Sequence, residues 1–447
     1  MITNLPVELF WNCCKFLTLV DISKYDVACL NKLQRNCFLQ YLKYGSFDDN
    51  LSEKLNDKTS NFEDWILKRN ISLSIIETNM FSSFDNILRI ARQSKFLHHL
   101  ILNSFEWNIS HQFHISALLS TICQKTALIS INCDKLNYLL IQMIGYFCFD
   151  IPINIRFDVI NQYTVDDVLK NISLCLPLLQ SLQIYGCCYS SHIIYDYGIS
   201  EILRKCKFLK ELYIQSCGCA SIDSDETLVL LSQSKYLEKI KISDSLFITD
   251  YGFHTLFSMS KNLQYVDISY NSNIGDASIS LVSNLKNLRC FVCTETKCTG
   301  ESIINIVNNC PLLEVLNFKH CSYDNETILT IAKKAHNLNS LTFGTYLENI
   351  DVEYSTMVQL AQNCLKLKIL TIFNVIFSLN DDFVNVLSIY NNRITHLIVP
   401  DSIISQIDVF LHYFPDLIEL CLNENYISNT DFFILLKCQP DLLFSCV

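Results

Sequence analysis

The sequence predicts an α/β solenoid, in which short parallel strands alternate with helices, preceded by a small all-α module. Three observations lead to this prediction. An apolar block recurs at nearly constant spacing, amphipathic helical stretches lie between successive blocks, and residues 1–44 lack that period. Hydrophobic residues make up 50% of the 447-residue chain and charged residues only 18%, a composition that excludes a disordered protein.

The recurring block has the pattern apolar-x-x-apolar-x-apolar. Its strong copies begin at Leu179, Leu209, Leu237, Leu263, Leu288, Leu313, Leu338, Leu367, Ile394 and Leu417. The steps between them average about 26 residues, within the range of about 20–29 that is typical of leucine-rich repeats. Weaker or partial copies lie upstream, at Leu73/Ile75, Leu97/Leu100/Leu102, Leu128/Ile131/Cys133 and Ile155/Phe157. We therefore expect a solenoid over 65–447 with about 13–15 repeats, weaker before residue 175.

Each block has the alternation of a short strand, because its fourth and sixth positions are apolar and their neighbours are polar. The stretch after a block is helical in pattern, with Ile303, Ile306 and Cys310 on one face. Thr249 and Asp324 stand where helix N-caps are needed. Because strands stack about 4.8 Å apart and helices are about 10 Å thick, the array should curve into a horseshoe with its strands on the concave face. Segment 440–447 is expected to form an incomplete last strand.

The 22 cysteines are expected to be reduced. Residues 1–10 lack the basic region and apolar run of a signal peptide, which favours a cytoplasmic or nuclear location. Cysteines recur at the ends of helices and in the turns after strands, where they should form a buried ladder of thiols. Cys290 and Cys293, with Cys298, are the best candidates for a metal site, but Cys290 and Cys293 should face opposite sides of a strand. We expect neither a metal site nor a cofactor.

Other classes of function find little support in the sequence. The net charge of −11 argues against a nucleic-acid partner. The most apolar stretch, 138–149, is shorter than the roughly 18 residues of a membrane-spanning helix, so no membrane partner is expected. The sequence contains no GxGxxG, P-loop, HExxH or GxSxG motif, so no catalytic residue is assigned.

The blocks, often preceded by Cys and followed by Cys or Asn, resemble the cysteine-containing leucine-rich-repeat family found in F-box proteins and mitotic-exit regulators. The resemblance covers about residues 97–447 and concerns the fold and subfamily rather than the partner.

Residues 1–44 are expected to form three short helices, with an apolar stripe that includes Leu9, Cys13 and Leu17. This segment resembles an F-box, through matches at Leu5, Pro6, Glu8, Leu9, Leu17, Asp21, Ile22 and the Ala28-Cys29 pair. It departs from the usual F-box pattern where Cys13 and Cys14 replace Ile and Phe, and where no Trp follows Cys29. An ordinary helical cap for the solenoid is the alternative. The polar segment 45–64 is expected to be a linker.

The resemblance implies a non-catalytic substrate-recognition subunit of a Skp–cullin–F-box E3 ubiquitin ligase. The N-terminal helices would bind a Skp-type adaptor, and through it a cullin, by Leu5, Pro6, Glu8, Leu9, Cys13, Leu17 and Ile22. One alternative is a leucine-rich-repeat scaffold or inhibitor without a ubiquitin-ligase link. A GTPase-activating protein is disfavoured, because nothing marks a catalytic Arg or Asn.

Positions three, five and seven of each block should point away from the core, toward a protein substrate. The expected substrate-binding residues are Tyr185, Glu211, Tyr213, Gln215, Lys241, Tyr265, Asp267 and Lys319. This set is mixed in charge and rich in tyrosine, a composition suited to protein surfaces.

Overall fold

The computed structural model describes residues 60–78, 83–95, 97–103, 112–133, 138–158, 165–185, 196–215, 224–245, 247–345, 350–373, 375–376, 381–399, 414–422 and 443–446. These residues fall into two compact units that divide around residues 186–210. The expected F-box-like module at 1–44, with all of its proposed adaptor-binding residues, lies outside the described residues.

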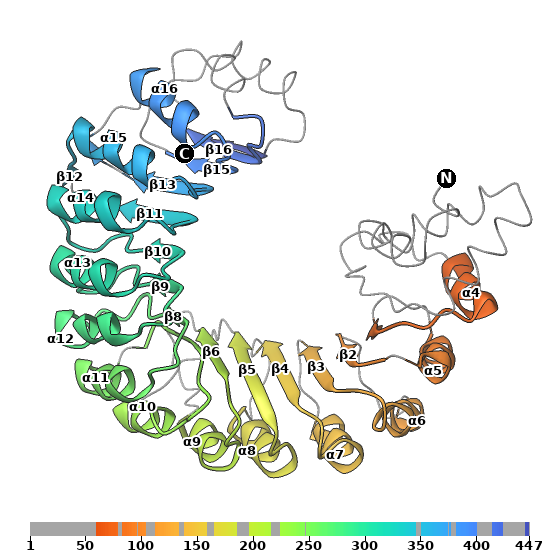
Figure 1. The fold of residues 1–447 in the computed structure, drawn as a ribbon. Helices are drawn as coiled ribbons and strands as arrows, with labels where there is room; N and C mark the ends of the chain where they lie inside the picture. The colour runs from red at the N-terminus through yellow and green to blue at the C-terminus, as the bar shows by residue number, and fades with distance from the viewer. Residues whose placement is uncertain are drawn as a thin grey trace, which may run out of the picture. The chain divides into compact units, whose positions relative to one another are not determined.

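The first unit alternates helices with parallel strands that pair in chain order from β1 to β5 (Figure 1). Its elements are α4 (Ser60–Arg69), β1 (Ile75–Glu77), α5 (Phe84–Gln93), β2 (His99–Leu102), α6 (Gln112–Ile122), β3 (Leu128–Cys133), α7 (Tyr138–Phe147), β4 (Ile153–Asp158), α8 (Val165–Cys175) and β5 (Leu179–Tyr185). Helix α4 begins at Ser60, so the last five residues of the expected linker 45–64 are helical. Helix α9 (Asp196–Lys205) spans the division between the units.

The second unit repeats the same alternation, and its helices α10–α15 lie along one side of the strands (Figure 1). Its strands are β6 (Glu211–Gln215), β7 (Lys239–Ser243), β8 (Tyr265–Asp267), β9 (Cys290–Val292), β10 (Val315–Asn317), β11 (Ser340–Gly344), β13 (Ile369–Phe373), β15 (His396–Ile398), β16 (Glu419–Leu422) and β17 (Leu443–Cys446), all parallel. Its helices are α10 (Asp225–Leu231), α11 (Asp250–Met259), α12 (Asp276–Ile279), the 3-10 helix η5 (Ser280–Asn284), α13 (Gly300–Asn309), α14 (Asn325–Lys334), α15 (Tyr354–Asn363) and α16 (Asp381–Tyr390). Strands β12 (Ile350–Asp351) and β14 (Val375–Ile376) form a separate short pair.

The core is built as the repeat predicts. In one repeat the block residues Leu313, Leu316 and Phe318 are buried, and they meet the buried face of α13, which includes Ile303 and Ile306. A single strand and helix cannot bury such faces, but stacked neighbours bury them in a continuous core. The parallel strands alternating with helices confirm the predicted leucine-rich-repeat solenoid.

Helix N-termini of neighbouring repeats are joined by aspartates. Thr249 caps α11 as predicted, accepting a hydrogen bond from the Tyr251 N–H at 3.2 Å, and its own N–H and hydroxyl donate to Asp225 at the start of α10. Asp276 of α12 accepts the corresponding bonds from the N–H of Thr299, at 2.9 Å, and from its hydroxyl, at 2.7 Å. Each aspartate thus satisfies donors that the next helix leaves unpaired.

The pairing of β2 with β3 corrects the predicted alignment of blocks. Leu100 pairs with Ile129 and Leu102 with Ile131, two residues earlier than a block starting at Leu128 predicts. Because side chains alternate with a period of two, a slip of two residues leaves the same face inward, and Ile129 and Ile131 are both buried.

The expected last strand of segment 440–447 is present as β17. It pairs in parallel with β16, with Glu419 opposite Leu443 and Leu422 opposite Cys446. Leu443 is exposed, and it lies opposite Glu419, an outward position of the block that starts at Leu417.

Candidate functional site

The strands of the second unit carry a polar and aromatic surface on the side away from the core. We call it the strand face and define it by the outward positions of β6–β8 and of β10 with the turn that follows. Its residues are Glu211, Tyr213, Gln215, Lys239, Lys241, Tyr265, Asp267, Asn317 and Lys319. Most are half-buried, whereas the alternate positions Leu212, Ile214 and Ile240 are in the core, as the period of two requires.

Opposite charges on the strand face lie directly across from each other. Lys239 is opposite Glu211, and their Nζ and Oε1 atoms are 2.7 Å apart. Lys241 is opposite Asp267, with Nζ and Oδ2 3.3 Å apart. Such cross-strand pairs contribute only about 0.2–1 kcal/mol each. Their main consequence is that these four charges neutralise one another and hold the lysine stems in place.

Two tyrosines of the strand face meet across β7. The rings of Tyr213 on β6 and Tyr265 on β8 are 5.6 Å apart between centroids and tilted by 47°. They meet diagonally, because Tyr213 is opposite Lys241 on β7 and Tyr265 is opposite Lys239. Tyrosine offers a large contact area together with a polar hydroxyl, which suits it to the centre of a protein interface.

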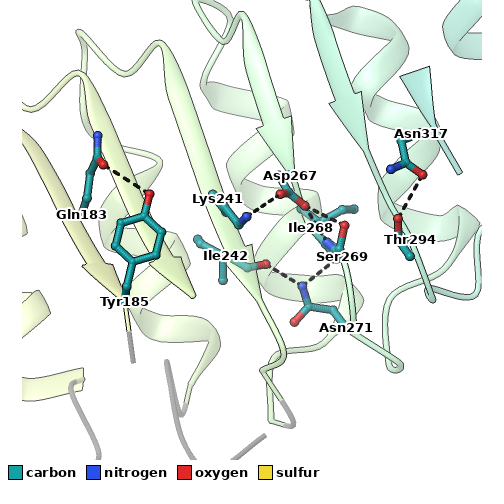
Figure 2. Close-up of polar contacts among 10 residues, drawn as sticks. All are labelled: Gln183, Tyr185, Lys241, Ile242, Asp267, Ile268, Ser269, Asn271, Thr294 and Asn317. Carbon is teal, nitrogen blue, oxygen red and sulfur yellow. Dashed lines mark hydrogen bonds and ion pairs between the residues drawn. The ribbon is translucent and has the colours of Figure 1, made fainter. Parts of the chain in front are cut away.

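Asp267 differs from the sequence prediction, because it is buried rather than exposed toward a substrate. Its side chain is only 7% exposed, and both carboxylate oxygens are engaged (Figure 2). Oδ2 faces Lys241, while Oδ1 accepts hydrogen bonds from the Ser269 N–H at 3.1 Å and from the Ser269 hydroxyl at 2.7 Å. Asp267 therefore positions Lys241 and the turn after β8.

Lys319 reaches an aromatic ring that the sequence did not associate with it. Its Nζ lies 3.7 Å from the ring centroid of Phe373, the geometry of a cation–π contact. Phe373 on β13 is opposite Gly344 on β11, which follows β10 in the sheet. Lys319 therefore extends past β11, the neighbouring strand, to reach this ring. The backbone of Lys319 is held by Asn317, whose Oδ1 accepts its N–H at 3.1 Å and also bonds the Thr294 hydroxyl (Figure 2).

In each turn after β7–β10, one residue has a left-handed backbone conformation with a positive φ. These positions were not predicted from the sequence. These residues are Asp244, Tyr270, Glu295 and His320, with φ between 54° and 63°. Each N–H donates to a carbonyl of the next turn, at 2.7–3.2 Å, so the unusual backbone is repeated in register. The signal was available in the sequence, because all four occupy the position seven residues after the start of their block.

Charges gather at these turns. Burial raises the pKa of Asp244, and the nearby Glu295 carboxylate raises it further. Burial also raises the pKa of Tyr270, with added effects from Glu295, Asp267 and Asp244. In the turn after β10, burial lowers the pKa of His320, and the Lys319 ammonium lowers it further.

Of the other expected substrate-binding residues, Gln215 is exposed at the end of β6, and Tyr185 belongs to the first unit. The guanidinium carbon of Arg156 lies 4.6 Å from the Tyr185 ring centroid, and the Tyr185 hydroxyl donates to Gln183 at 3.3 Å (Figure 2). Arg156 has no signal in the sequence, because only the pairing of β4 with β5 places it opposite Gln183 and diagonal to Tyr185.

Within the described residues, no group of three or more His, Cys, Asp or Glu side chains is arranged to hold a metal ion. The described helices also include none that is long and apolar enough to cross a membrane.

No protein-family model matches the chain. Among solved structures, an internalin from Listeria monocytogenes is similar over 67% of this chain and 74% of that chain, with 17% identity and a TM-score of 0.40. A leucine-rich-repeat protein from Leptospira interrogans is similar over 90% and 99%, with 14% identity and a TM-score of 0.40. The complex of Rad7 and Elc1 from yeast is similar over 98% and 94%, with 14% identity and a TM-score of 0.47.

Proposed function

We propose that this protein is the substrate-recognition subunit of a Skp–cullin–F-box E3 ubiquitin ligase, which binds a protein substrate through the strand face. The observation that carries the binding role is the strand face itself, where two tyrosines lie among neutralised charge pairs on a rigid parallel sheet. The link to the ligase rests on the F-box-like residues, above all Leu5, Pro6 and Leu9.

The proposed role needs no bond chemistry from this chain. Catalysis would take place on a conjugating enzyme that the cullin recruits, and the solenoid would raise the effective concentration of substrate lysines near it. The strand face suits this task, because its ion pairs and its turn hydrogen bonds keep the contacting side chains ordered before the substrate arrives.

The experiment compares affinity purifications of the full chain, two test variants and one control variant from cells of the source organism. Leu9→Asp places a charge in the apolar stripe of the N-terminal module, and should abolish recovery of the Skp-type adaptor and the cullin while leaving the solenoid folded. The double variant Tyr213→Ala/Tyr265→Ala should keep the adaptor and cullin but lose proteins held by the strand face. Tyr251→Ala, an exposed tyrosine on α11, is the matched control and should lose neither.

Circular dichroism of each variant reports whether the solenoid remains folded. Equal recovery of the adaptor by wild type and Leu9→Asp would remove the F-box assignment. If no adaptor or cullin accompanies even the wild-type chain, while the tyrosine variant still loses a bound protein, the protein is a leucine-rich-repeat scaffold or inhibitor instead.

A further inference from the structure

Three thiols from two consecutive repeats meet in the core of the second unit. Cys293 follows β9, Cys298 precedes α13, and Cys321 lies in the turn after β10. The Sγ atoms of Cys293 and Cys321 are 4.0 Å apart. The Cys298 thiol, which donates to the Thr299 carbonyl at 3.5 Å, is close enough to shift the pKa of both. Cys293 and Cys298 are fully buried, and Cys321 is 4% exposed. The binding role proposed for the strand face makes no use of this cluster.

Cys321 is the common partner within the cluster. Its thiol donates to the Cys293 carbonyl at 3.0 Å, which keeps its sulfur beside Cys293, and the Thr296 hydroxyl lies 3.6 Å from that sulfur. The neighbouring thiols, Cys293 first and then Cys298, lower the pKa of Cys321, against the opposing effect of burial. Burial raises the pKa of Cys293 instead. Of these two thiols, Cys321 is therefore the one whose ionisation the cluster favours.

Other buried cysteines of the chain show a different arrangement. The thiols of Cys206, Cys310 and Cys364 each donate to a backbone carbonyl of the preceding repeat, at 3.4–3.6 Å. Burial raises the pKa of Cys206 to about 12, of Cys310 to about 11 and of Cys364 to about 12. These three thiols therefore serve as reference cysteines within the same chain, against which oxidation of the thiol cluster can be compared.

We propose that Cys293, Cys298 and Cys321 form a peroxide-sensitive thiol site, in which Cys321 is oxidised first and then forms a disulfide with Cys293. In the first step the Cys321 sulfur attacks one oxygen of hydrogen peroxide. The S–O bond forms, the O–O bond breaks, and the departing hydroxide takes the thiol proton as water. In the second step the Cys293 sulfur attacks the sulfenic sulfur, the S–O bond breaks, and a second water leaves with the Cys293 proton. Two thiols and one peroxide thus give one disulfide and two waters.

The second step must bring the two sulfurs together. A disulfide needs its sulfurs about 2.05 Å apart, so the present separation must close by roughly 2 Å. The two repeats are already joined at this point, since the Cys293 N–H donates to the Asn317 carbonyl at 2.9 Å. A reversible bond of this kind is compatible with a reducing compartment, where disulfides are transient and responsive.

The test treats the folded full-length chain, freed of reductant, with increasing hydrogen peroxide. Differential thiol labelling and peptide mass spectrometry then report each cysteine. We expect Cys321 to lose its free thiol at a peroxide dose at least tenfold below that for Cys310 and Cys364, and a cross-linked peptide pair joining Cys321 to Cys293, reversed by dithiothreitol. In Cys293→Ser, a sulfenic acid at Cys321 should persist long enough to be captured by dimedone.

The matched control variant is Cys310→Ser, which should leave the cross-link unchanged. Thermal unfolding followed by circular dichroism shows whether each variant is folded, and the ranking of thiols in the wild type needs no variant at all. Oxidation of Cys321 no earlier than Cys310 and Cys364 would overturn the proposal. A disulfide that joins Cys298 rather than Cys293 to Cys321 would overturn the assignment of its partner.

Discussion

Asn271→Ala should destabilise the second unit more than the substitution of any exposed residue. The Asn271 side chain forms hydrogen bonds with backbone groups of β7 and of the turns after β7 and β8. Asn271 is fully buried in the turn after β8. Its amide Nδ2 donates to the carbonyls of Ile242 at 2.7 Å and Ile268 at 2.8 Å (Figure 2). Its Oδ1 accepts the Ser245 N–H at 2.9 Å. The substitution therefore removes three hydrogen bonds, of which those with Ile242 and Ser245 join two adjacent repeats.

The magnitude follows from those three bonds. A typical hydrogen bond contributes about 1 kcal/mol net, but a buried group left without a partner costs roughly 1–3 kcal/mol. Two carbonyls and one N–H lose their partner in Asn271→Ala, and water can enter the space to satisfy some of them. We expect the free energy of unfolding of the second unit to fall by about 3–5 kcal/mol.

Urea denaturation followed by circular dichroism measures this loss, and hydrogen exchange of the Ser245 amide measures it locally. Asn305→Ala, on the exposed face of α13, is the matched control and should change stability by less than about 0.5 kcal/mol. The reasoning is refuted if Asn271→Ala costs less than about 1 kcal/mol, or if the Ser245 amide exchanges no faster than in the wild type.

Two further substitutions test positions beside the strand face, Gly344 at the end of β11 and His320 in the turn after β10. Gly344→Ala should lower stability by roughly 2 kcal/mol or more in thermal unfolding, because φ is 108° and an added Cβ would lie 1.9 Å from the Phe373 carbonyl oxygen. Gly275→Ala, whose added Cβ would meet Lys297 no closer than 3.5 Å, should cost less, and equal losses would contradict this reasoning. His320 has a folded pKa below its unfolded value of 6.5, so the unfolded state binds more protons and stability should fall as pH drops below 6.5. His320→Gln should flatten that dependence in denaturation curves measured at several pH values, and an unchanged slope would show that His320 does not contribute.

The sequence predicted the repeating architecture because its signal is local and redundant. A block of three apolar positions defines a strand and its inward face, and the stripe of Ile303 and Ile306 defines the helix that covers it. Even where the alignment of β2 with β3 was wrong by two residues, the inward face was right, because side chains alternate with a period of two. The capping roles of Thr249 and Asp324 were equally readable, since a cap needs only neighbours in sequence.

By itself, then, the sequence determined the α/β repeat, the inward and outward positions of its strands, and the polar, tyrosine-rich character of the strand face. Only the tertiary structure decided which outward residues meet. It buried Asp267 against Lys241 and brought Lys319 to Phe373 on β13, beyond the neighbouring strand β11. These contacts depend on the register and on the side-chain volume of other repeats, which no single block encodes. For the same reason a regular ladder of cysteines in the sequence could not reveal that Cys293 and Cys321 lie within 4.0 Å of each other.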